Sequence, residues 1–244
     1  MVGRRSVESQ PGFILHTRPY RESSLLIELF SQDYGKVGLI AKGVRGRRSP
    51  WQGLLQPLMP LTLNWVGRSE LQTLTEVDGL PMAQALRGRR LYCGLYLNEL
   101  LAHFLHRDDP HPQLFAHYAL TLNQLAAGVV IEPLLRYFEQ QLLSEVGYGL
   151  QLTHEIKQGM AISAERSYCY QIESGPVDVG PVSRESNQNS IDGATLIALR
   201  QAQLDNPRVL QQAKQLLRRV IAFHMGGKPL QSRAIFTARS SFGR

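Results

Sequence analysis

Cysteines and long apolar runs are both scarce in this sequence, and each scarcity excludes a class of protein. Cys93 and Cys169 are the only cysteines among 244 residues, too few for a disulfide framework or an all-cysteine zinc site. No run approaches the about 18 consecutive apolar residues of a membrane-spanning helix, and residues 1–12 lack the apolar stretch of a secretory signal. We therefore expect a cytoplasmic protein that does not enter a membrane.

Motifs of enzymatic catalysis are also missing. The sequence has no G-x-S-x-G nucleophile elbow, and Gly226-Gly227-Lys228 lacks the spacing and the Ser/Thr of a phosphate-binding P-loop. The one group of metal-binding residue types surrounds a predicted turn between helices, where polar residues are common without a metal. We therefore expect no enzyme activity, no bound metal and no cofactor. That group comprises His103, His106, His111, His117, Asp108 and Asp109.

Acidic residues are absent from two long stretches. The chain has a net charge of +7 and a pI near 9.6, but the 36 residues between Asp33 and Glu70 carry +6, the 39 residues after Asp205 carry +8, and the remainder carries −7. Soluble surfaces usually mix both signs, so we interpret the two stretches as contacts for nucleic acid rather than as solvated faces alone. The cations assigned to this binding are Lys36, Lys42, Arg45, Arg47, Arg48, Arg68, Arg218, Arg219, Lys228 and Arg233.

Residues 12–80 have the pattern of a small β-barrel. Five short apolar or alternating runs are separated by turn signals such as Asp33-Tyr34-Gly35. So many strands in so short a span predict a barrel, either the oligonucleotide/oligosaccharide-binding (OB) type or an SH3-like type. The predicted strands are Phe13–Leu15, Leu25–Phe30, Val37–Ala41, Leu61–Val66 and Leu71–Thr75.

From Pro81 onward the apolar period becomes helical. Helices with one strongly apolar face need one another, so we expect a bundle built from residues 81–150 and 191–244. Asp205 or Asn206 is placed to cap its last long helix. The apolar stripes run over Leu97–Leu105, Phe115–Leu125, Leu135–Val146 and Leu210–Ile221.

Residues 151–190 interrupt the bundle. They lose the helical period and gain Gly, Ser, Pro and Asn, while Tyr168–Ile172 and Val177–Val182 can pair as two strands. The predicted fold class is therefore α+β: an N-terminal five-stranded barrel, a helical domain and a small irregular or β insert.

Two further residues have alternative interpretations. Trp51 follows the basic run that ends at Arg48, so it either stacks on a nucleobase or packs into the barrel mouth. Arg136 lies between apolar neighbours on a predicted helix. It either pairs with Glu132 or Glu139 or holds a carboxylate at the rim of an apolar groove.

Seven segments, in order and spread over nearly the whole chain, give the sequence its resemblance to the bacterial RecO family, and to its gammaproteobacterial type in particular. No segment is diagnostic alone, but the ordered set is specific. The segments are 12–18 (GFILHTR), 39–45 (LIAKGVR), 54–58 (LLQPL), 95–101 (LYLNELL), 135–139 (LRYFE), 147–149 (GYG) and 226–233 (GGKPLQSR).

The resemblance implies an OB-fold over residues 1–80 and a non-enzymatic mediator of DNA repair and recombination. Such proteins bind single- and double-stranded DNA, anneal complementary strands and, with RecR, help RecA load on DNA coated by single-stranded DNA-binding protein (SSB). The resemblance also implies that Arg136 lies in the helix that offers a site for the acidic C-terminal tail of SSB. The protein alone is expected to be a monomer, associated with the nucleoid.

The insert departs from the family pattern. Members that bind zinc use four cysteines there, whereas this chain has His154-Glu155 and Gln158-Gly159 near the first expected pair, and Cys169 stands alone. We therefore expect a degenerate zinc-ribbon-like insert over residues 151–190 that is held together by packing.

Two other functions are compatible with the residues alone. An RNA-binding or ribosome-associated OB-fold protein would be equally basic and equally without catalytic motifs. A metal-dependent nuclease would use Asp108, Asp109 and the neighbouring histidines.

Overall fold

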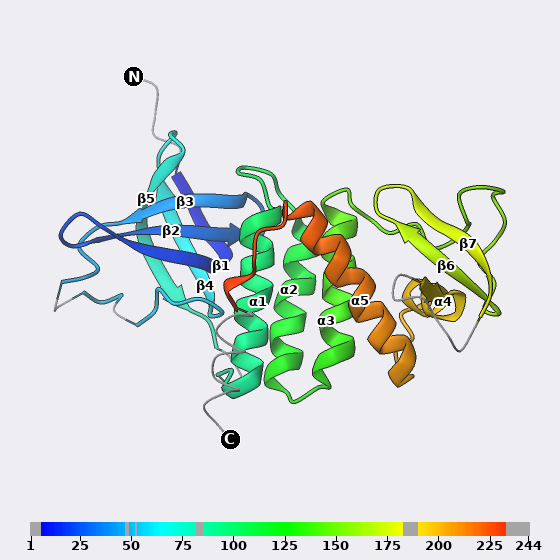
Figure 1. Cartoon of the computed structure of the whole chain (residues 1–244). Helices are drawn as coiled ribbons and strands as arrows, with labels where there is room; N and C mark the ends of the chain where they lie inside the picture. The colour runs from blue at the N-terminus through cyan, green and yellow to red at the C-terminus, as the bar shows by residue number, and fades with distance from the viewer. Residues whose placement is uncertain (1–5, 47–48, 52, 82–84, 183–189, 233–244) are drawn as a thin grey trace. The chain divides into compact units, whose positions relative to one another are not determined.

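The computed structural model describes residues 6–46, 49–51, 53–81, 85–182 and 190–232 (Figure 1). Arg47, Arg48 and Arg233 lie outside the described residues. The chain divides into two compact units. One holds the described residues up to Val129 and from Leu230 onward, and the other is Val130–Pro229. The domain boundaries expected from the sequence stay a prediction.

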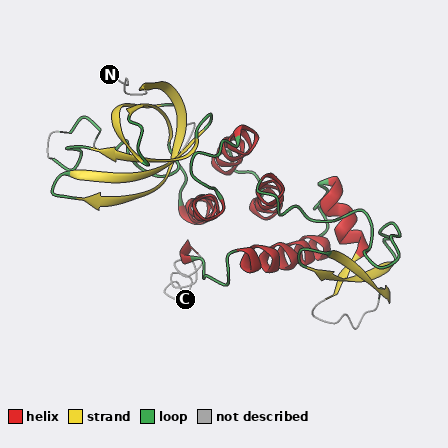
Figure 2. Cartoon of the chain, turned by 90° about the horizontal axis from the view of Figure 1, so that it is seen from above, coloured by secondary structure: helices red, strands yellow, loops and turns green. Residues whose placement is uncertain are grey.

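The first unit begins with five strands: β1 (Ser6–Tyr20), β2 (Ser24–Ser31), β3 (Gly35–Ala41), β4 (Pro60–Val66) and β5 (Leu71–Gly79). They form a closed barrel in the order β1-β2-β3-β5-β4, in which β4 pairs back onto β1 (Figures 1 and 2). The β3–β5 pair is parallel and the other pairs are antiparallel. This is the OB-fold arrangement, which confirms the predicted fold class.

Strand β1 is much longer than the three residues predicted for it. Its first half pairs with β4 through Phe13, and its second half pairs with β2 from Gly12 to Tyr20. In the sequence the Arg18-Pro19 pair is a turn signal, but Pro19 lies near the end of the strand, where the loss of one N–H donor is tolerated. Pairing with two neighbours therefore extends a strand that its own apolar pattern marks only in part.

Two helices complete the first unit: α1 (Gly88–Phe104) and α2 (Pro112–Ala126). Aromatic rings on the outside of the barrel pack against α2. The Phe13 ring lies 5.4 Å from Phe115 and 5.0 Å from Tyr118, and Phe30 lies 5.3 Å from Phe115. Such tilted and edge-on pairs add to the apolar burial that holds helix and barrel together.

A buried amide joins α1 to the barrel. The side-chain nitrogen of Asn98 donates to the carbonyls of Ile14 (3.0 Å) and Leu15 (3.2 Å) on β1, next to the point where the β1–β2 register shifts. Its oxygen accepts a hydrogen bond from the Tyr118 hydroxyl of α2. Burial raises the pKa of Tyr118 above its ordinary value, which keeps that hydroxyl a donor. One side chain of α1 thus satisfies polar groups of both β1 and α2.

The turn that follows β2 approaches the connection between α1 and α2. Gly35 has φ +65°, and a Cβ there would lie 2.0 Å from the Asp109 carbonyl oxygen. Only glycine fits this approach. The next residue, Lys36, donates from its ammonium to the Ala102 carbonyl at 2.8 Å, near the end of α1.

The second unit contains three helices and a small sheet. The helices are α3 (Ile131–Glu145), α4 (Gly193–Gln201) and α5 (Pro207–His224), and the strands are β6 (Arg166–Gln171), β7 (Gly175–Pro181) and β8 (Ser190–Asp192). The two predicted strands of the insert are confirmed, and they pair antiparallel. Strand β8, which also pairs with β6, has only three residues, too few to show alternation in the sequence.

The predicted cap of the last long helix is confirmed at Asn206. Its side chain accepts hydrogen bonds from the backbone N–H groups of Arg208 (2.9 Å) and Val209 (3.3 Å), and Pro207 occupies the first helical position. An Asn followed by Pro is a strong helix start because the cap satisfies free N–H groups and proline lacks one.

A carboxylate organises the loop of residues 155–160. Glu155 is buried and accepts N–H bonds from Lys157 (2.8 Å), Gln158 and Met160 (3.4 Å). Burial would raise the pKa of Glu155, but these three donors together lower it below its ordinary value. The loop is therefore held by a charged side chain and its own backbone.

We predict that Asn98→Leu lowers the free energy of unfolding by about 2 kcal/mol or more, because buried polar groups lose their partners. Urea unfolding of the whole chain measures the change. Asn123→Ala, which alters an exposed residue of α2, is the matched control and should stay within about 0.5 kcal/mol of the parent protein. Equal effects of the two substitutions would contradict the role given to Asn98.

We also predict that acid removes the stabilisation that the Glu155 carboxylate provides. Because its pKa is lowered on folding, that stabilisation is complete above the ordinary carboxyl pKa of 4.5 and is lost as the pH falls through the lowered value. Glu155→Gln should therefore be less stable than the parent protein at neutral pH, and the difference should shrink on acidification. Thermal unfolding across this pH range measures it, and a pH-independent difference would contradict the prediction.

Candidate nucleic-acid interface

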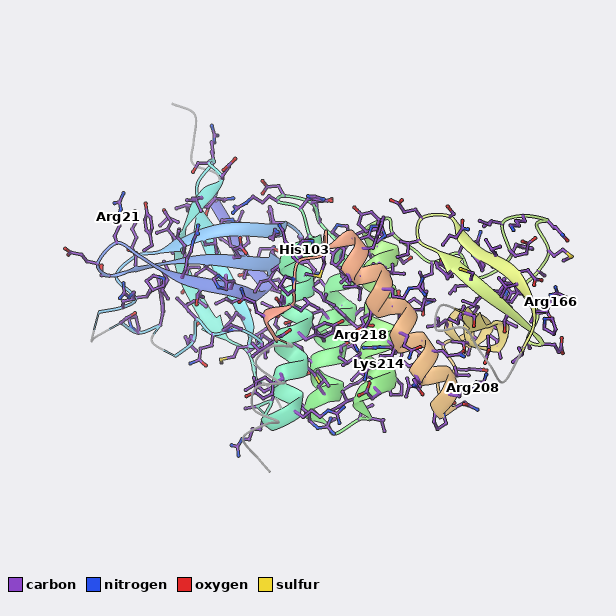
Figure 3. The ribbon with its side chains drawn as sticks, viewed as in Figure 1. Arg21, His103, Arg166, Arg208, Lys214 and Arg218 are labelled. Atoms are coloured by element: carbon purple, nitrogen blue, oxygen red, sulfur yellow. The ribbon has the colours of Figure 1, made fainter. Side chains whose placement is uncertain are left out.

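Three described cations of the barrel lie together at the free end of the β1–β2 hairpin. The backbone N–H of Arg45 donates to the Ser23 carbonyl at 2.9 Å, and its guanidinium donates to the Arg21 carbonyl at 3.2 Å. Lys42 directly follows β3, whose last residue pairs with Leu25 at the start of β2. All three side chains are exposed. We call Arg21, Lys42 and Arg45 the hairpin cluster; Figure 3 labels Arg21 at the end of the hairpin.

Arg21 belongs to this cluster but is absent from the sequence prediction. It precedes Glu22, outside the acid-free segment that guided the choice of residues. Its position between the first two apolar runs could have indicated this role. In three consecutive antiparallel strands, the turn between the first two strands and the residues after the third lie at the same end of the sheet. The exposed Arg18 lies on the same hairpin, near the end of β1.

Trp51 is half-buried and packs against the apolar interior of the barrel. Of its two interpretations, the structure therefore supports packing at the barrel. This placement also holds the segment after the basic run close to the barrel wall. No nucleobase contact is required to explain the residue.

Lys36 and Arg68 do not join the hairpin cluster. Burial lowers the pKa of Lys36; the charge of Glu28 opposes this effect and that of Arg107 adds to it. The Lys36 ammonium is already bonded to α1. Arg68 is exposed in the β4–β5 turn, where it lines a hollow together with Asp33.

Arg68 and the hairpin cluster lie near opposite ends of β2. The β2–β3 turn beside Arg68 and the β1–β2 turn are separated by the eight residues of that strand, or about 25 Å at the rise of a β-strand. The hollow around Arg68 also contains Glu70 and Asp108. The first acid-free segment is thus distributed over two regions of different charge.

The cations predicted on the C-terminal helix lie in the second unit. Arg218 and Arg219 are exposed on α5 and line a hollow of about 260 Å³ between this helix and the small sheet. Arg219 also donates to the Tyr170 carbonyl of β6 at 3.3 Å. Lys228 is exposed just after the helix.

Two other cations of α5 are neutralised by acids from elsewhere in the sequence. Arg208 pairs with Asp192 (2.9 Å), and Lys214 pairs with Glu132 (3.1 Å). Figure 3 shows Arg208, Lys214 and Arg218 spaced along the helix. The second acid-free segment therefore has part of its positive charge paired with acidic residues from other segments in the folded protein.

Arg136 is buried on α3, with 3% of its surface exposed, and its NH2 group pairs with Glu139 at 2.5 Å. The structure thus places it inside the unit and not at an exposed rim. Its Nε and NH1 have no hydrogen-bond partner among the described residues. Buried donors are rarely left in this state without a water or ligand acceptor.

The histidine-rich turn does not assemble a metal centre. Within the described ranges, no three His, Cys, Asp or Glu side chains are grouped so that they could hold a metal ion. The His111 Nε2 instead lies 3.3 Å from the Asp109 Oδ2, and the His103 ring packs edge-on against Phe104.

None of the helices that the structure describes is long and apolar enough to cross a membrane.

Comparison with known proteins identifies the family. The family model described as "Recombination protein O N terminal" matches residues 6–81, and the one described as "Recombination protein O C terminal" matches residues 86–234. The chain belongs to the RecO family. The predicted resemblance is thereby confirmed, and with it a role in DNA repair and recombination.

Several curated relatives match this RecO-family chain over nearly its full length. "DNA repair protein RecO" of Methylococcus capsulatus is 44% identical over 93% of this chain and 92% of the relative. The protein of the same name from Nitrosococcus oceani is 45% identical over 93% and 91%, and that from Haemophilus influenzae is 40% identical over 94% and 96%.

Proposed function

We propose that this RecO-family protein is a non-enzymatic mediator that binds single- and double-stranded DNA and anneals complementary strands. The observation that supports this most directly is the hairpin cluster, which presents Arg21, Lys42 and Arg45 on an OB barrel. Exposed cations on a barrel of this type bind phosphates without reading bases. Arg47 and Arg48 continue the same segment in the sequence.

Annealing needs charge neutralisation and no catalytic residue. Two complementary strands repel each other through their phosphates, and cations that bind both backbones lower that repulsion while releasing counterions. A surface that contacts only backbones leaves the bases free to pair. DNA as ligand would place the protein with the nucleoid.

We further propose that the protein acts with RecR on SSB-coated DNA, so that RecA can load. In this proposal the acidic tail of SSB binds at the helices around Arg136. The unpartnered Nε and NH1 of Arg136 are suitable donors for a carboxylate. Because Arg136 is buried beside Glu139, tail binding would require local rearrangement of α3 or its neighbours.

Strand annealing of SSB-coated complementary oligonucleotides tests the proposal. The protein should accelerate annealing, and SSB lacking its C-terminal tail should reduce the acceleration on coated DNA while leaving naked DNA unaffected. A parallel titration with single-stranded RNA tests the alternative, an RNA-binding or ribosome-associated protein. Tighter binding to RNA than to DNA, together with no annealing, would favour that alternative.

We predict that Arg45→Glu weakens DNA binding for every sequence tested. It should also flatten the dependence of log K on log salt by about 0.7 for each phosphate of a single strand that the protein no longer neutralises. Fluorescence anisotropy over a range of salt concentrations measures both effects. Arg68→Glu makes the same charge change in the β4–β5 turn and should alter neither. Equal effects of the two substitutions would exclude the hairpin cluster as the principal DNA-binding surface.

A further inference from the structure

Two sequence segments that the proposed function leaves unused meet in the second unit. Gly147-Tyr148-Gly149 follows α3, and Gly226-Gly227-Lys228 follows α5. The Tyr148 ring stacks on His224, the last residue of α5, with centroids 3.9 Å apart and planes inclined by 16°. The ends of the two helices are therefore side by side.

Glycine caps hold these residues in place. Gly147 has φ +84°, and the N–H of Tyr148 then bonds the Leu143 carbonyl of α3 at 2.7 Å. At the end of α5, Gly227 has φ +73°, and its backbone N–H donates to the Ala222 carbonyl of that helix at 3.0 Å. Both are the left-handed turns that end helices and that glycine favours. The aromatic side chains are thus carried by well-defined backbone.

Two aromatic side chains at these helix ends are exposed. Phe223 is 51% exposed and Tyr148 is 43% exposed, although large aromatic side chains are among the groups that gain most from burial. Burial lowers the pKa of the adjoining His224, despite an opposing influence of Glu173, so its ring is neutral at pH 7. We call Tyr148, Phe223 and His224 the aromatic ledge.

Cations lie along one side of the ledge. Arg219 precedes Phe223 by one helical turn and therefore lies on the same side of α5. It lines the hollow that also contains Arg218 and Gln215. Lys228 is exposed just beyond the helix end. Aromatic faces next to a cationic groove are the combination by which proteins bind single-stranded nucleic acid.

We propose that the aromatic ledge is a second DNA site, where an unpaired base of a single strand stacks on Phe223 or Tyr148 and its phosphate is bound at the hollow by Arg218 and Arg219. The inference rests on the proposed function and extends it. Stacking requires a base that has left the duplex, so the ledge selects single strands. It uses the face of the base and leaves the pairing edge free for a complementary strand.

Binding of an oligothymidylate of about 16 nucleotides, compared with a duplex of equal length, tests the site in the full chain. Phe223→Ala should weaken single-strand binding by about 5-fold or more, as expected for the loss of one base–aromatic stack, and should leave duplex binding unchanged. Leu120→Ala is the matched control, since it removes an exposed apolar side chain (54% exposed) from α2. It should change neither affinity.

A direct reporter guards against indirect effects of the alanine substitution. Phe223→Trp places an indole on the ledge, and its emission, after subtraction of the parent signal from Trp51 and Trp65, should be quenched as the oligonucleotide binds. An unquenched indole on saturation, or equal losses for single strand and duplex with Phe223→Ala, would overturn the ledge while leaving DNA binding in place. A changed sedimentation coefficient with unchanged DNA affinity would mean that Phe223 contacts a second copy of the chain. If the parent protein binds no DNA, both proposals fail.

Discussion

Asn98 provides the polar contact on which the packing of the first unit depends. Where the register of β1 against β2 shifts, the buried Ile14 and Leu15 carbonyls of β1 face α1. Buried carbonyls need donors, and a single amide supplies two. Its oxygen binds Tyr118, so the same side chain also sets the position of α2. The hairpin that carries the cationic cluster is the continuation of β1, and its position depends on this contact.

Charge in this protein is organised differently in space than along the chain. The acid-rich remainder supplies Asp192 and Glu132 to α5, so two of its cations are neutralised. In the barrel, Arg45 joins Arg21 from a different segment, whereas Arg68 lies among acids near the opposite end of β2. An acid-free run in the sequence therefore does not define a continuous basic surface in the structure.

Hydrogen bonds to two carboxylates organise the loops and strands of residues 151–182 in the second unit. The backbone N–H groups of Lys157, Gln158 and Met160 converge on the Glu155 carboxylate. The β6 and β7 strands are further linked by the Arg166–Asp178 pair, and the pKa of Asp178 is lowered chiefly by its hydrogen bond to Arg166. Charge and hydrogen bonding thus hold this part of the chain, although the residues involved carry no recognisable motif.

Elements with a strong local pattern can be predicted from the sequence alone. Alternation in Leu61, Leu63 and Trp65 predicts β4, and Asn206 before Pro207 predicts the start of α5. Tertiary structure alone decided that β1 runs for 15 residues, that Arg136 is buried against Glu139, and that Tyr148 meets His224. Periodicity and capping involve residues close together in the chain, so the amino-acid sequence shows them directly. Strand pairing, side-chain burial and ring stacking depend on positions far apart in the chain, and only folding brings them together.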